Sequence, residues 1–239
     1  MIEGRLSVAV EHAGYKDFHE YVDAALNDKS GDMVNFLITK LTTNFTYFMR
    51  EETHYRFLTE RALPEWTAKI KDRDLRTWSA GCSSGEEAYT AAITILEYLG
   101  GTRSGWDTTV LATDISPKVL AAAKSGLYQA GRLEGLPNNL LNKYFVKQDA
   151  DNYRVGPDLT KQVVFAPLNL MEPFRFKRKF HIIFCRNVMI YFDNDTKRRL
   201  AAKFYDVLEP GGYLFVGLSE TLSGLSEKFI SVSPSIYTK

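Results

Sequence analysis

The sequence is poor in the residues that build metal centres, disulfide scaffolds and membrane spans. Its two cysteines, Cys82 and Cys185, show neither metal-ligand spacing nor a disulfide framework, and its four histidines are scattered along the chain. No apolar run approaches the roughly 20 residues of a membrane helix, and the start of the chain has no secretory apolar region. We therefore expect a cytoplasmic protein with no metal site, no histidine-based triad and no segment inserted into a membrane.

An excess of charge of one sign is also lacking, because 30 lysines and arginines stand against 29 aspartates and glutamates. A chain with this balance has no general attraction to nucleic acid. The phosphate-binding pattern GxxxxGK followed by Ser or Thr is absent, as are GxGxxG and GxSxG. With 239 residues, of which 45% are hydrophobic, the chain is long enough for one large α/β domain and a small additional domain.

Alternating strand and helix patterns begin near residue 72. Apolar runs rich in β-branched residues predict strands, and helical patterns lie between several of them. Ser116 and Pro117 are good N-cap and N1 residues for one helix. We expect strands at 75–78, 109–113, 163–166, 181–184 and 213–216, and helices from about 86, at 117–124 and at 194–208. The alternation predicts an α/β fold, a doubly wound, Rossmann-like, mostly parallel sheet with helices on both faces.

Other segments depart from this alternation. Residues 6–42 predict a small N-terminal helical domain with Asp32 as a candidate N-cap, and 43–71 predict a linker and a helix that ends before Pro64. The α/β domain spans 72–239, with an inserted antiparallel β-subdomain at about 128–161. Residues 208–212 are interpreted as a helix stop and the tail as an antiparallel edge strand. Residues 2–5, Ile-Glu-Gly-Arg, are either an expression linker or native helix and carry no functional argument.

The segment from Leu75 to Glu87, LRTWSAGCSSGEE, constrains function more tightly than any other. It predicts a strand, a small-residue loop and a helix, which is how α/β proteins approach an adenosine-containing cofactor. Gly81 allows a close approach that a Cβ would block. Glu86 and Glu87 open the helix where they would repel a pyrophosphate. S-adenosylmethionine, with its ribose hydroxyls and positive sulfonium, fits better; the alternative is a tight turn that binds no ligand.

Polar residues follow the expected strands at the sheet edge where α/β proteins bind ligands. Asp114 can accept hydrogen bonds from both ribose hydroxyls, cap the next helix, or do both. Asn169 can pair with an adenine edge or form an Asx turn. Arg186 and Asn187 follow a buried apolar run, so the arginine should meet an anion, which is either a ligand or a salt-bridge partner. The separation of Gly81 from Asp114 exceeds the roughly 20 positions of the dinucleotide fingerprint, which disfavours a nicotinamide dehydrogenase.

Five motifs occur in order and together resemble the chemotaxis receptor methyltransferases of the CheR family, over about residues 17–238. They are LTTNFTYFMRE at 41–51, WSAGCSSGEEAY at 78–89, ATDIS at 112–116, FCRNVMIYF at 184–192 and LEPGGYLFVGLSE at 208–220. The resemblance implies a bacterial signalling enzyme with a helical domain, a linker, and a methyltransferase domain that carries a β-insertion. It also implies methyl transfer from S-adenosylmethionine to receptor glutamates, giving glutamate methyl ester and S-adenosylhomocysteine, for sensory adaptation.

The resemblance also implies cofactor roles for side chains before and within the α/β domain. With Gly81 added, the expected cofactor-binding residues are Asn44, Thr46, Arg50, Gly81, Glu86, Asp114, Asn169, Leu170, Arg186 and Asn187. Asn44, Thr46 and Arg50 come from the resemblance alone. Arg50 makes physical sense as a bidentate partner of the methionine carboxylate.

The implied partner is the cytoplasmic domain of a chemotaxis receptor, and in some family members the β-subdomain also binds a receptor C-terminal peptide. The N-terminal domain is expected to be truncated, because members usually have another helical segment before Asp17, often basic, whereas residues 6–40 are nearly balanced in charge. We expect a monomer that binds no nucleic acid.

Methylation of a glutamate needs no general base, because its ordinary pKa near 4.3 makes it an anion at neutral pH. No catalytic acid or base is therefore assigned. Two alternatives stay open: a methyltransferase-like module that binds cofactor or receptor without transfer, and a methyltransferase that acts on RNA or a small molecule. Cys82 and Cys185 are expected close to the cofactor and to each other; the alternative is that they only fill space in the core.

Overall fold

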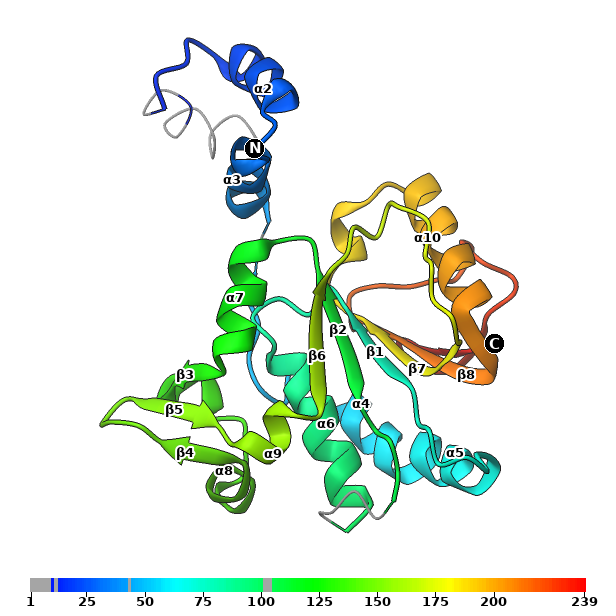
Figure 1. Ribbon diagram of the computed structural model, residues 1–239. Coiled ribbons are helices and arrows are strands. Elements are labelled where there is room, and N and C mark those ends of the chain that lie inside the picture. Colours follow the sequence, from blue (N-terminus) through cyan, green and yellow to red (C-terminus); the bar gives the residue numbers. More distant parts are fainter. Residues whose placement is uncertain (1–9, 11–12, 43, 101–104) are drawn as a thin grey trace.

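The computed structural model describes residues 10, 13–42, 44–100 and 105–239. Its central sheet has the strand order β6-β2-β1-β7-β8-β10-β9 (Figure 1). The parallel strands are β1 (Thr77–Ala80), β2 (Val110–Asp114), β6 (Val163–Pro167), β7 (Phe180–Cys185) and β8 (Leu208–Val216). The chain moves outward from β1 to β2 and β6 and then returns to β7 on the other side of β1. The predicted doubly wound sheet is confirmed, and its switch point lies between β1 and β7.

Helices cover both faces of this sheet, as the alternation predicts. On one face, α6 (Glu86–Tyr98) and α7 (Pro117–Ser125) pack on residues such as Ala112 and Phe184. On the other face, α10 (Asn194–Val207) packs its Phe204 against Trp78, at 5.4 Å between ring centroids. Successive strand residues point to opposite faces, and this alternation lets both apolar layers form from the same short strands.

The helix before the sheet is longer than predicted. It consists of α4 (Glu52–Phe57), the π-helical turn Leu58–Ala62 and α5 (Leu63–Lys69), so the prediction that it ends before Pro64 is wrong. The widened turn directly before Pro64 accommodates a residue that has no N–H to donate. Residues 208–212 are likewise part of β8 and not a simple helix stop.

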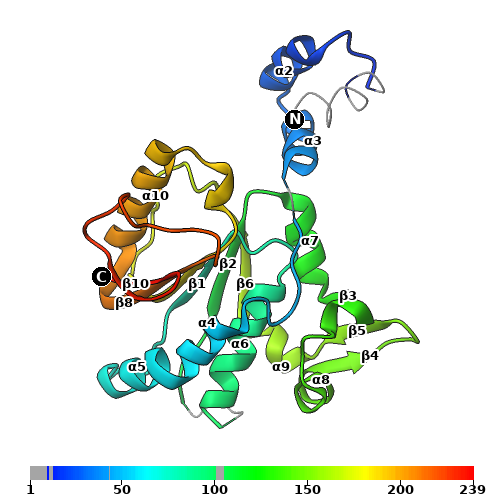
Figure 2. The same ribbon diagram turned by 180° about the vertical axis from the view of Figure 1, so that it is seen from behind.

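Two N-terminal helices, α2 (Phe18–Asn27) and α3 (Asp32–Leu41), form an apolar cluster of their own. They stand away from the sheet in both views (Figure 2). Gly31, not Asp32, is the N-cap of α3, and a carboxylate oxygen of Asp28 accepts from the Met33 N–H instead. Residues 2–9 and 43, on which part of the sequence interpretation falls, lie outside the described residues, and the domain boundaries at 42 and 71 stay predictions.

The insertion after α7 contains a three-stranded antiparallel sheet in the order β3-β5-β4, called here the small sheet. Its strands are β3 (Leu127–Gln129), β4 (Phe145–Lys147) and β5 (Asn152–Val155). Between and after them lie the short helices η2 (Ala130–Leu133), α8 (Asn138–Tyr144) and α9 (Pro157–Thr160). The tail adds β9 (Ile230–Ser233) and β10 (Ile236–Thr238). β10 pairs antiparallel with β8, as predicted for the tail, and β9 pairs with β10 and forms the edge of the sheet.

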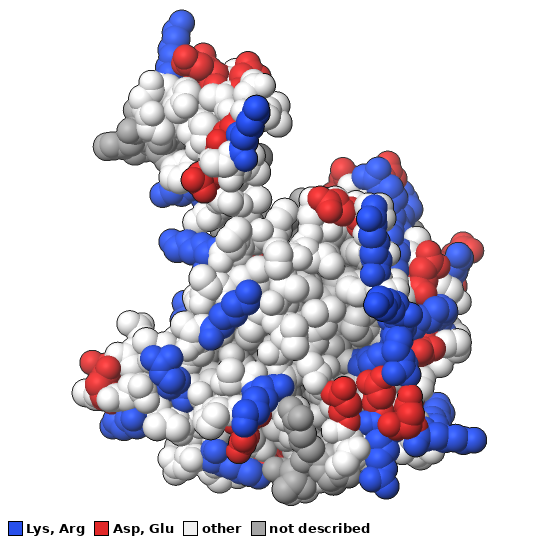
Figure 3. All heavy atoms as spheres, in the orientation of Figure 1, with Lys and Arg blue, Asp and Glu red and all other residues white. Residues whose placement is uncertain are grey.

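Basic and acidic side chains intermingle on the face shown in Figure 3, most densely along its right-hand edge. Mixing of this kind fits a net charge of +1. Within the described part of the chain, no helix has the length and hydrophobicity to cross a membrane. Those residues also contain no group of three or more His, Cys, Asp or Glu side chains arranged to hold a metal ion.

Candidate functional site

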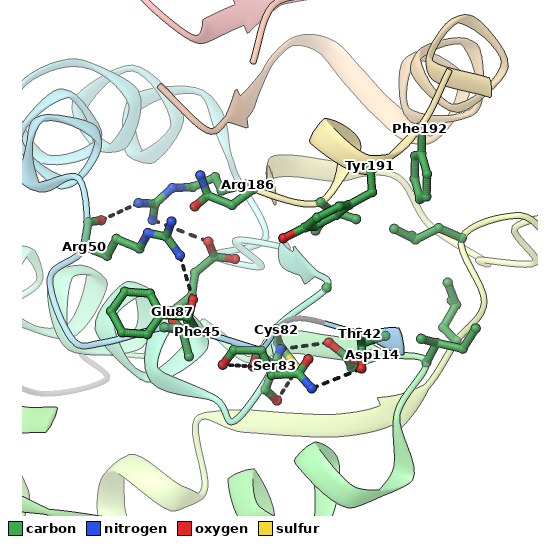
Figure 4. A pocket seen from close by; sticks show the side chains of 18 of the residues that line it. Thr42, Phe45, Arg50, Cys82, Ser83, Glu87, Asp114, Arg186, Tyr191 and Phe192 are labelled. Atoms are coloured by element: carbon green, nitrogen blue, oxygen red, sulfur yellow. Dashed lines mark hydrogen bonds and ion pairs between the residues drawn. The ribbon is translucent and has the colours of Figure 1, made fainter. Parts of the chain in front are cut away.

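A cavity of about 350 Å³ opens at the carboxyl ends of β1, β2, β6 and β7, beside the switch point (Figure 4). The segment that enters α4 closes one side of it, and the 3₁₀ turn η3 (Met189–Tyr191) borders another. Nine of the ten expected cofactor residues line it: Asn44, Thr46, Arg50, Gly81, Asp114, Asn169, Leu170, Arg186 and Asn187. Residues far apart in sequence therefore converge on one hollow, where open α/β sheets bind ligands.

The loop between β1 and α6 owes its shape to glycine. Gly81 has φ +85°, and a Cβ on it would come within 2.5 Å of a Val188 methyl carbon. Its N–H and that of Cys82 both donate to the Thr113 carbonyl, at 2.8 and 2.9 Å, which holds the loop against the end of β2. Gly81 is therefore needed for packing of the protein against itself, and this sets where the loop lies beside the cavity.

The two acids that open α6 have separate environments. Glu86 is fully buried outside the cavity lining, with its oxygens bonded to Ser84 Oγ and Arg132. Glu87 lines the cavity, accepts a 2.7 Å hydrogen bond from Ser79 Oγ and lies 3.4 Å from Arg186 Nη1. Burial raises the pKa of Glu87 although Arg186 opposes this shift. The structure thus presents Glu87, rather than the expected Glu86, to a ligand.

Asp114 ends β2 with its carboxylate held by the backbone. One oxygen accepts from the Ser83 N–H and the other from the Ser116 N–H, both at 2.9 Å. Burial raises the pKa of Asp114, and these backbone hydrogen bonds work against that shift. The carboxylate thus braces the start of α7 and still lines the cavity. Ser116 occupies the N-cap position, as expected, but its hydroxyl makes no capping hydrogen bond.

Asn169 and Leu170 follow β6 and border the same cavity. The side-chain oxygen of Asn169 accepts from the Met171 N–H at 2.9 Å, which is the Asx turn considered from the sequence. Among the described residues, the side-chain N–H₂ group of Asn169 has no hydrogen-bond partner. The turn therefore fixes the side chain while leaving its two donors for a ligand.

Arg186 lies at the centre of a buried network of charges. Its guanidinium is 3.2 Å from Glu51 and 3.4 Å from Glu87, and it donates to the Tyr55 hydroxyl at 2.9 Å and to the Arg50 carbonyl. Arg186 has only 2% of its side chain exposed. The anion expected to meet this arginine is therefore a pair of carboxylates of the protein. Despite burial, Arg186 lowers the pKa of Glu51 and keeps that group ionised.

Arg50 is differently placed from Arg186. Its guanidinium donates to the Phe45 carbonyl at 2.8 Å and lies over the rings of Phe45 and Tyr47, each 5.9 Å from its centroid. It forms no ion pair with a carboxylate of the described residues, yet it lines the cavity. Such an arginine can bind an incoming carboxylate bidentately.

Unusual backbone conformations gather here. Within the described ranges, six residues other than glycine have a positive φ, and four of them, Met49, Glu51, Ser83 and Asn187, lie in or directly beside the cavity lining. A left-handed conformation costs such residues free energy, which surrounding contacts must offset. Asn187 illustrates the offset, because its N–H donates to Glu220 at 2.8 Å and its side chain to Glu51 at 3.3 Å.

Sequence reasoning missed Glu51, Tyr55 and Glu87, although Glu51 and Glu87 stand inside the motifs quoted for the family resemblance. Their adjacency to chosen residues, Arg50 and Glu86, was the available signal. Of the two cysteines expected near the cofactor, only Cys82 lines the cavity. Cys82 packs in the apolar cluster on one face of the sheet, whereas Cys185 packs in the cluster on the other face. Both are buried, which raises the pKa of each thiol.

Known proteins resemble this chain over nearly its whole length. The family description "CheR methyltransferase, SAM binding domain" matches residues 44–238. A chemotaxis protein methyltransferase of Borreliella burgdorferi is 43% identical over 243 residues, which cover 100% of this chain and 86% of that protein. One of Escherichia coli is 36% identical, covering 99% of this chain and 82% of that protein. Chemotaxis protein methyltransferase 1 of Pseudomonas aeruginosa is 34% identical, covering 99% and 88%.

These matches span the loop after β1, the segment that enters α4 and the turn after β7, which together build the cavity. The family description and the geometry therefore point to one cofactor, S-adenosylmethionine. The chain belongs to the CheR family of S-adenosylmethionine-dependent methyltransferases.

Proposed function

We propose that the protein transfers the methyl group of S-adenosylmethionine to glutamate carboxylates of chemotaxis receptors, leaving glutamate methyl ester and S-adenosylhomocysteine. The observation that carries the proposal is the cavity at the switch point, in a chain whose relatives are named chemotaxis protein methyltransferases. Its lining combines cations, carboxylates and a free amide donor, which suits a ligand that is charged at one end and carries ribose and adenine at the other.

The residues present fit this cofactor group by group. Arg50, uncommitted to a carboxylate of the described chain, would bind the methionine carboxylate. Glu87 would accept from the amino group, and Asp114 from the ribose hydroxyls through lone pairs left free by its two backbone hydrogen bonds. The N–H₂ group of Asn169 would donate to an adenine nitrogen. Asn44, Thr46, Leu170 and Asn187 complete the proposed contacts.

When bound, S-adenosylmethionine supplies an electrophilic methyl group on a sulfonium. A glutamate oxygen of the receptor would take this methyl group with formation of a C–O bond, and the electron pair of the broken C–S bond would stay on sulfur. No proton moves, because the glutamate is already an anion. The protein contributes alignment and exclusion of water, both recognised sources of rate. Tyr191 and Phe45 line the cavity and are 62% and 71% exposed, so an acceptor would enter past their rings.

The proposed partner is the cytoplasmic domain of a chemotaxis receptor, together with a receptor C-terminal peptide at the small sheet. The small sheet supports this placement because β3 and β4 are its edge strands, and each has an exposed apolar residue, Leu127 and Val146, at 42% and 53%. An extended peptide can add to such an edge through main-chain hydrogen bonds, with its side chains in contact with apolar residues.

The first test is calorimetric titration of S-adenosylmethionine and S-adenosylhomocysteine into the wild type, Asp114→Ala and Arg50→Ala. We expect wild-type binding in the micromolar range and, in each variant, a loss of about tenfold or more, because each removes a charged hydrogen-bonding partner. Unchanged affinity in Arg50→Ala would remove Arg50 from the cofactor site. A folded wild type that binds neither compound would rule out the enzyme and favour a binding module.

The second test identifies the acceptor. The protein is incubated with methyl-labelled S-adenosylmethionine and a receptor cytoplasmic fragment, and the product is treated with mild base. A glutamate methyl ester releases its label as methanol, whereas a methyl group on nitrogen stays attached. Base-stable label, or label that persists when the receptor glutamates are replaced by alanine, would contradict the proposed acceptor while leaving the methyltransferase intact.

A further inference from the structure

Arg132, in η2 at the base of the small sheet, makes an ion pair with a carboxylate that has no access to solvent. Its Nη1 lies 2.7 Å from Oε1 of Glu86, and Glu86 is 0% exposed, whereas the arginine side chain is 46% exposed. The other carboxylate oxygen accepts a 2.7 Å hydrogen bond from Ser84 Oγ. Among the described residues, Arg132 is the only basic side chain paired with Glu86, so it supplies the positive charge that makes burial of this carboxylate tolerable.

The same arginine contacts the segment that closes the cavity. Its Nη1 donates to the Thr46 carbonyl at 3.3 Å and to Ser84 Oγ at 3.4 Å, and its own carbonyl accepts from the Phe48 N–H at 3.4 Å. Thr46 and Ser83, the neighbour of Ser84, both line the cavity. One residue of the insertion therefore joins the loop after β1 to the segment before α4, although neither of these belongs to the insertion.

The surrounding packing keeps this junction in place. Phe48 makes edge-to-face contacts with Tyr128 and Phe145 of the small sheet, at 5.0 and 5.4 Å between ring centroids. The Tyr128 hydroxyl donates to the Ser84 carbonyl at 2.6 Å. A Cβ on Gly135 would come within 2.5 Å of the Phe48 carbonyl oxygen, so the insertion lies directly against this segment.

We propose that Arg132 is a positioning residue for the cofactor, acting through Glu86 and Thr46 to hold the two cavity-lining segments in register; this rests on the proposed function. It does not itself line the cavity. Without its guanidinium, Glu86 is a buried anion without a counter-charge, and the loop at Ser83 and Ser84 must shift to bring water to it. The Ser83 N–H holds Asp114 and the Ser83 hydroxyl donates to the Asn44 carbonyl, so a shift there displaces groups proposed to bind the cofactor.

The test measures S-adenosylhomocysteine affinity by calorimetry for the wild type, Arg132→Ala and Arg132→Lys, with the thermal midpoint of each. We expect Arg132→Ala to bind about tenfold more weakly, because a buried charged group loses its partner. Arg132→Lys should recover part of the affinity, since it restores the charge without the second contact. Arg154→Ala is the matched control: Arg154 lies on β5 of the same small sheet, is exposed and bonds Gln148 and the Ser125 carbonyl. Its affinity should stay within about twofold of wild type.

A double-mutant cycle with Glu86→Gln separates positioning from a general loss of stability. If Arg132 acts through Glu86, the glutamine variant no longer needs the positive charge, so Arg132→Ala in that background should cost clearly less affinity than in the wild type. Equal losses in both backgrounds, or Arg132→Ala binding within twofold of wild type, would overturn the proposal. If Arg132→Ala does not fold, the comparison of Arg132→Lys with wild type decides. A wild type that binds no S-adenosylhomocysteine would instead refute the proposed function.

Discussion

Two arginines at opposite ends of the same pair of strands show what separates a site from a structural ion cluster. Arg186 follows β7 at its carboxyl end and pairs with Glu51 and Glu87. Arg76 precedes β1 at its amino end and pairs with Asp74 and Glu209, at 3.0 and 2.9 Å. Each arginine thus bridges two carboxylates. Each end also has a buried histidine, His54 beside Glu51 and His181 beside Arg76.

Both ends contain a residue with a left-handed backbone, because Arg73, next to Asp74, has φ +54°. The two ends differ in what they enclose. At the Arg76 end, the ring of Trp66 packs against that of His181, at 4.5 Å between centroids, and Arg76 and its two acids do not line the cavity. At the Arg186 end, Glu51 and Asn187 have left-handed backbones and the cavity lies directly beside the ion pairs. An arginine held between two acids is therefore not by itself a sign of function. Backbone strain next to an open cavity is the stronger sign, because only there can a strained residue be held in position to contact a ligand.

Replacing each arginine by methionine tests this difference and should give the largest effect. Arg186→Met leaves Glu51 and Glu87 without their counter-charge, and removal of one partner from a buried ion pair costs about 3–5 kcal/mol. We expect that loss in denaturant unfolding, together with loss of S-adenosylhomocysteine binding. Arg76→Met should cost less, because Asp74 and Glu209 are 21% and 28% exposed and water can replace the arginine. Cofactor binding lost equally in both variants would contradict the distinction.

A fall in pH should destabilise the clusters around Arg186 and Arg76, because each contains a buried histidine. Burial, together with the neighbouring Arg186 at His54 and Arg76 at His181, lowers the pKa of each histidine to about 4. As the pH falls, the unfolded chain therefore binds these protons before the folded chain does. The stability that each neutral histidine contributes is fully present above about pH 6.5 and is lost as the pH falls toward 4. Each histidine contributes at most about 3 kcal/mol to the free energy of unfolding. Glu87 and Asp114, whose pKa values are raised by burial, oppose this loss.

The measurement is the thermal midpoint from pH 7.5 to 4.5. His181→Asn should flatten its decline, since a neutral imidazole is needed to accept the Arg76 N–H at 3.0 Å. His19→Asn, at an exposed histidine, is the control and should follow the wild-type curve. A His181→Asn curve parallel to the wild type would show that His181 does not cause the acid sensitivity.

The smallest effect is expected at the outer edge of the Arg76 cluster. Arg178 pairs with Asp72 and Asp74, but its side chain is 55% exposed. Exposed ion pairs contribute little, because water and salt screen them and two long side chains must be ordered. Arg178→Ala should shift the thermal midpoint by no more than the scatter between repeated measurements, and it should leave the cofactor affinity unchanged. A clear drop would show that Asp74 depends on Arg178 as well as on Arg76.

Much of the sheet could be predicted because its pattern is local. Short apolar strands and the helical patterns between them placed β1, β2, β6 and β7 within two residues, and β8 at its carboxyl end only. The helix that continues past Pro64 was missed, because the π-helical turn that accommodates the proline has no sequence signature. Choosing between Glu86 and Glu87 was equally beyond the sequence. Adjacent residues on a helix point about 100° apart, and only the packing of α6 decides which one faces the cavity.

The sequence alone determined the alternation of strands and helices, and with it the edge at which Asp114, Asn169 and Arg186 had to meet. These features follow from residue spacing and from the handedness of crossover connections. Tertiary structure decided that Arg186 faces Glu51 and Glu87, and that Arg50, beside the same cavity, pairs with no carboxylate of the described residues. It also decided that the insertion lies against the cofactor loop through Arg132. The ion pairs of Arg132 and Arg186 join residues 46 or more positions apart, and their partners become defined only when the sheet, the helices and the insertion are packed together.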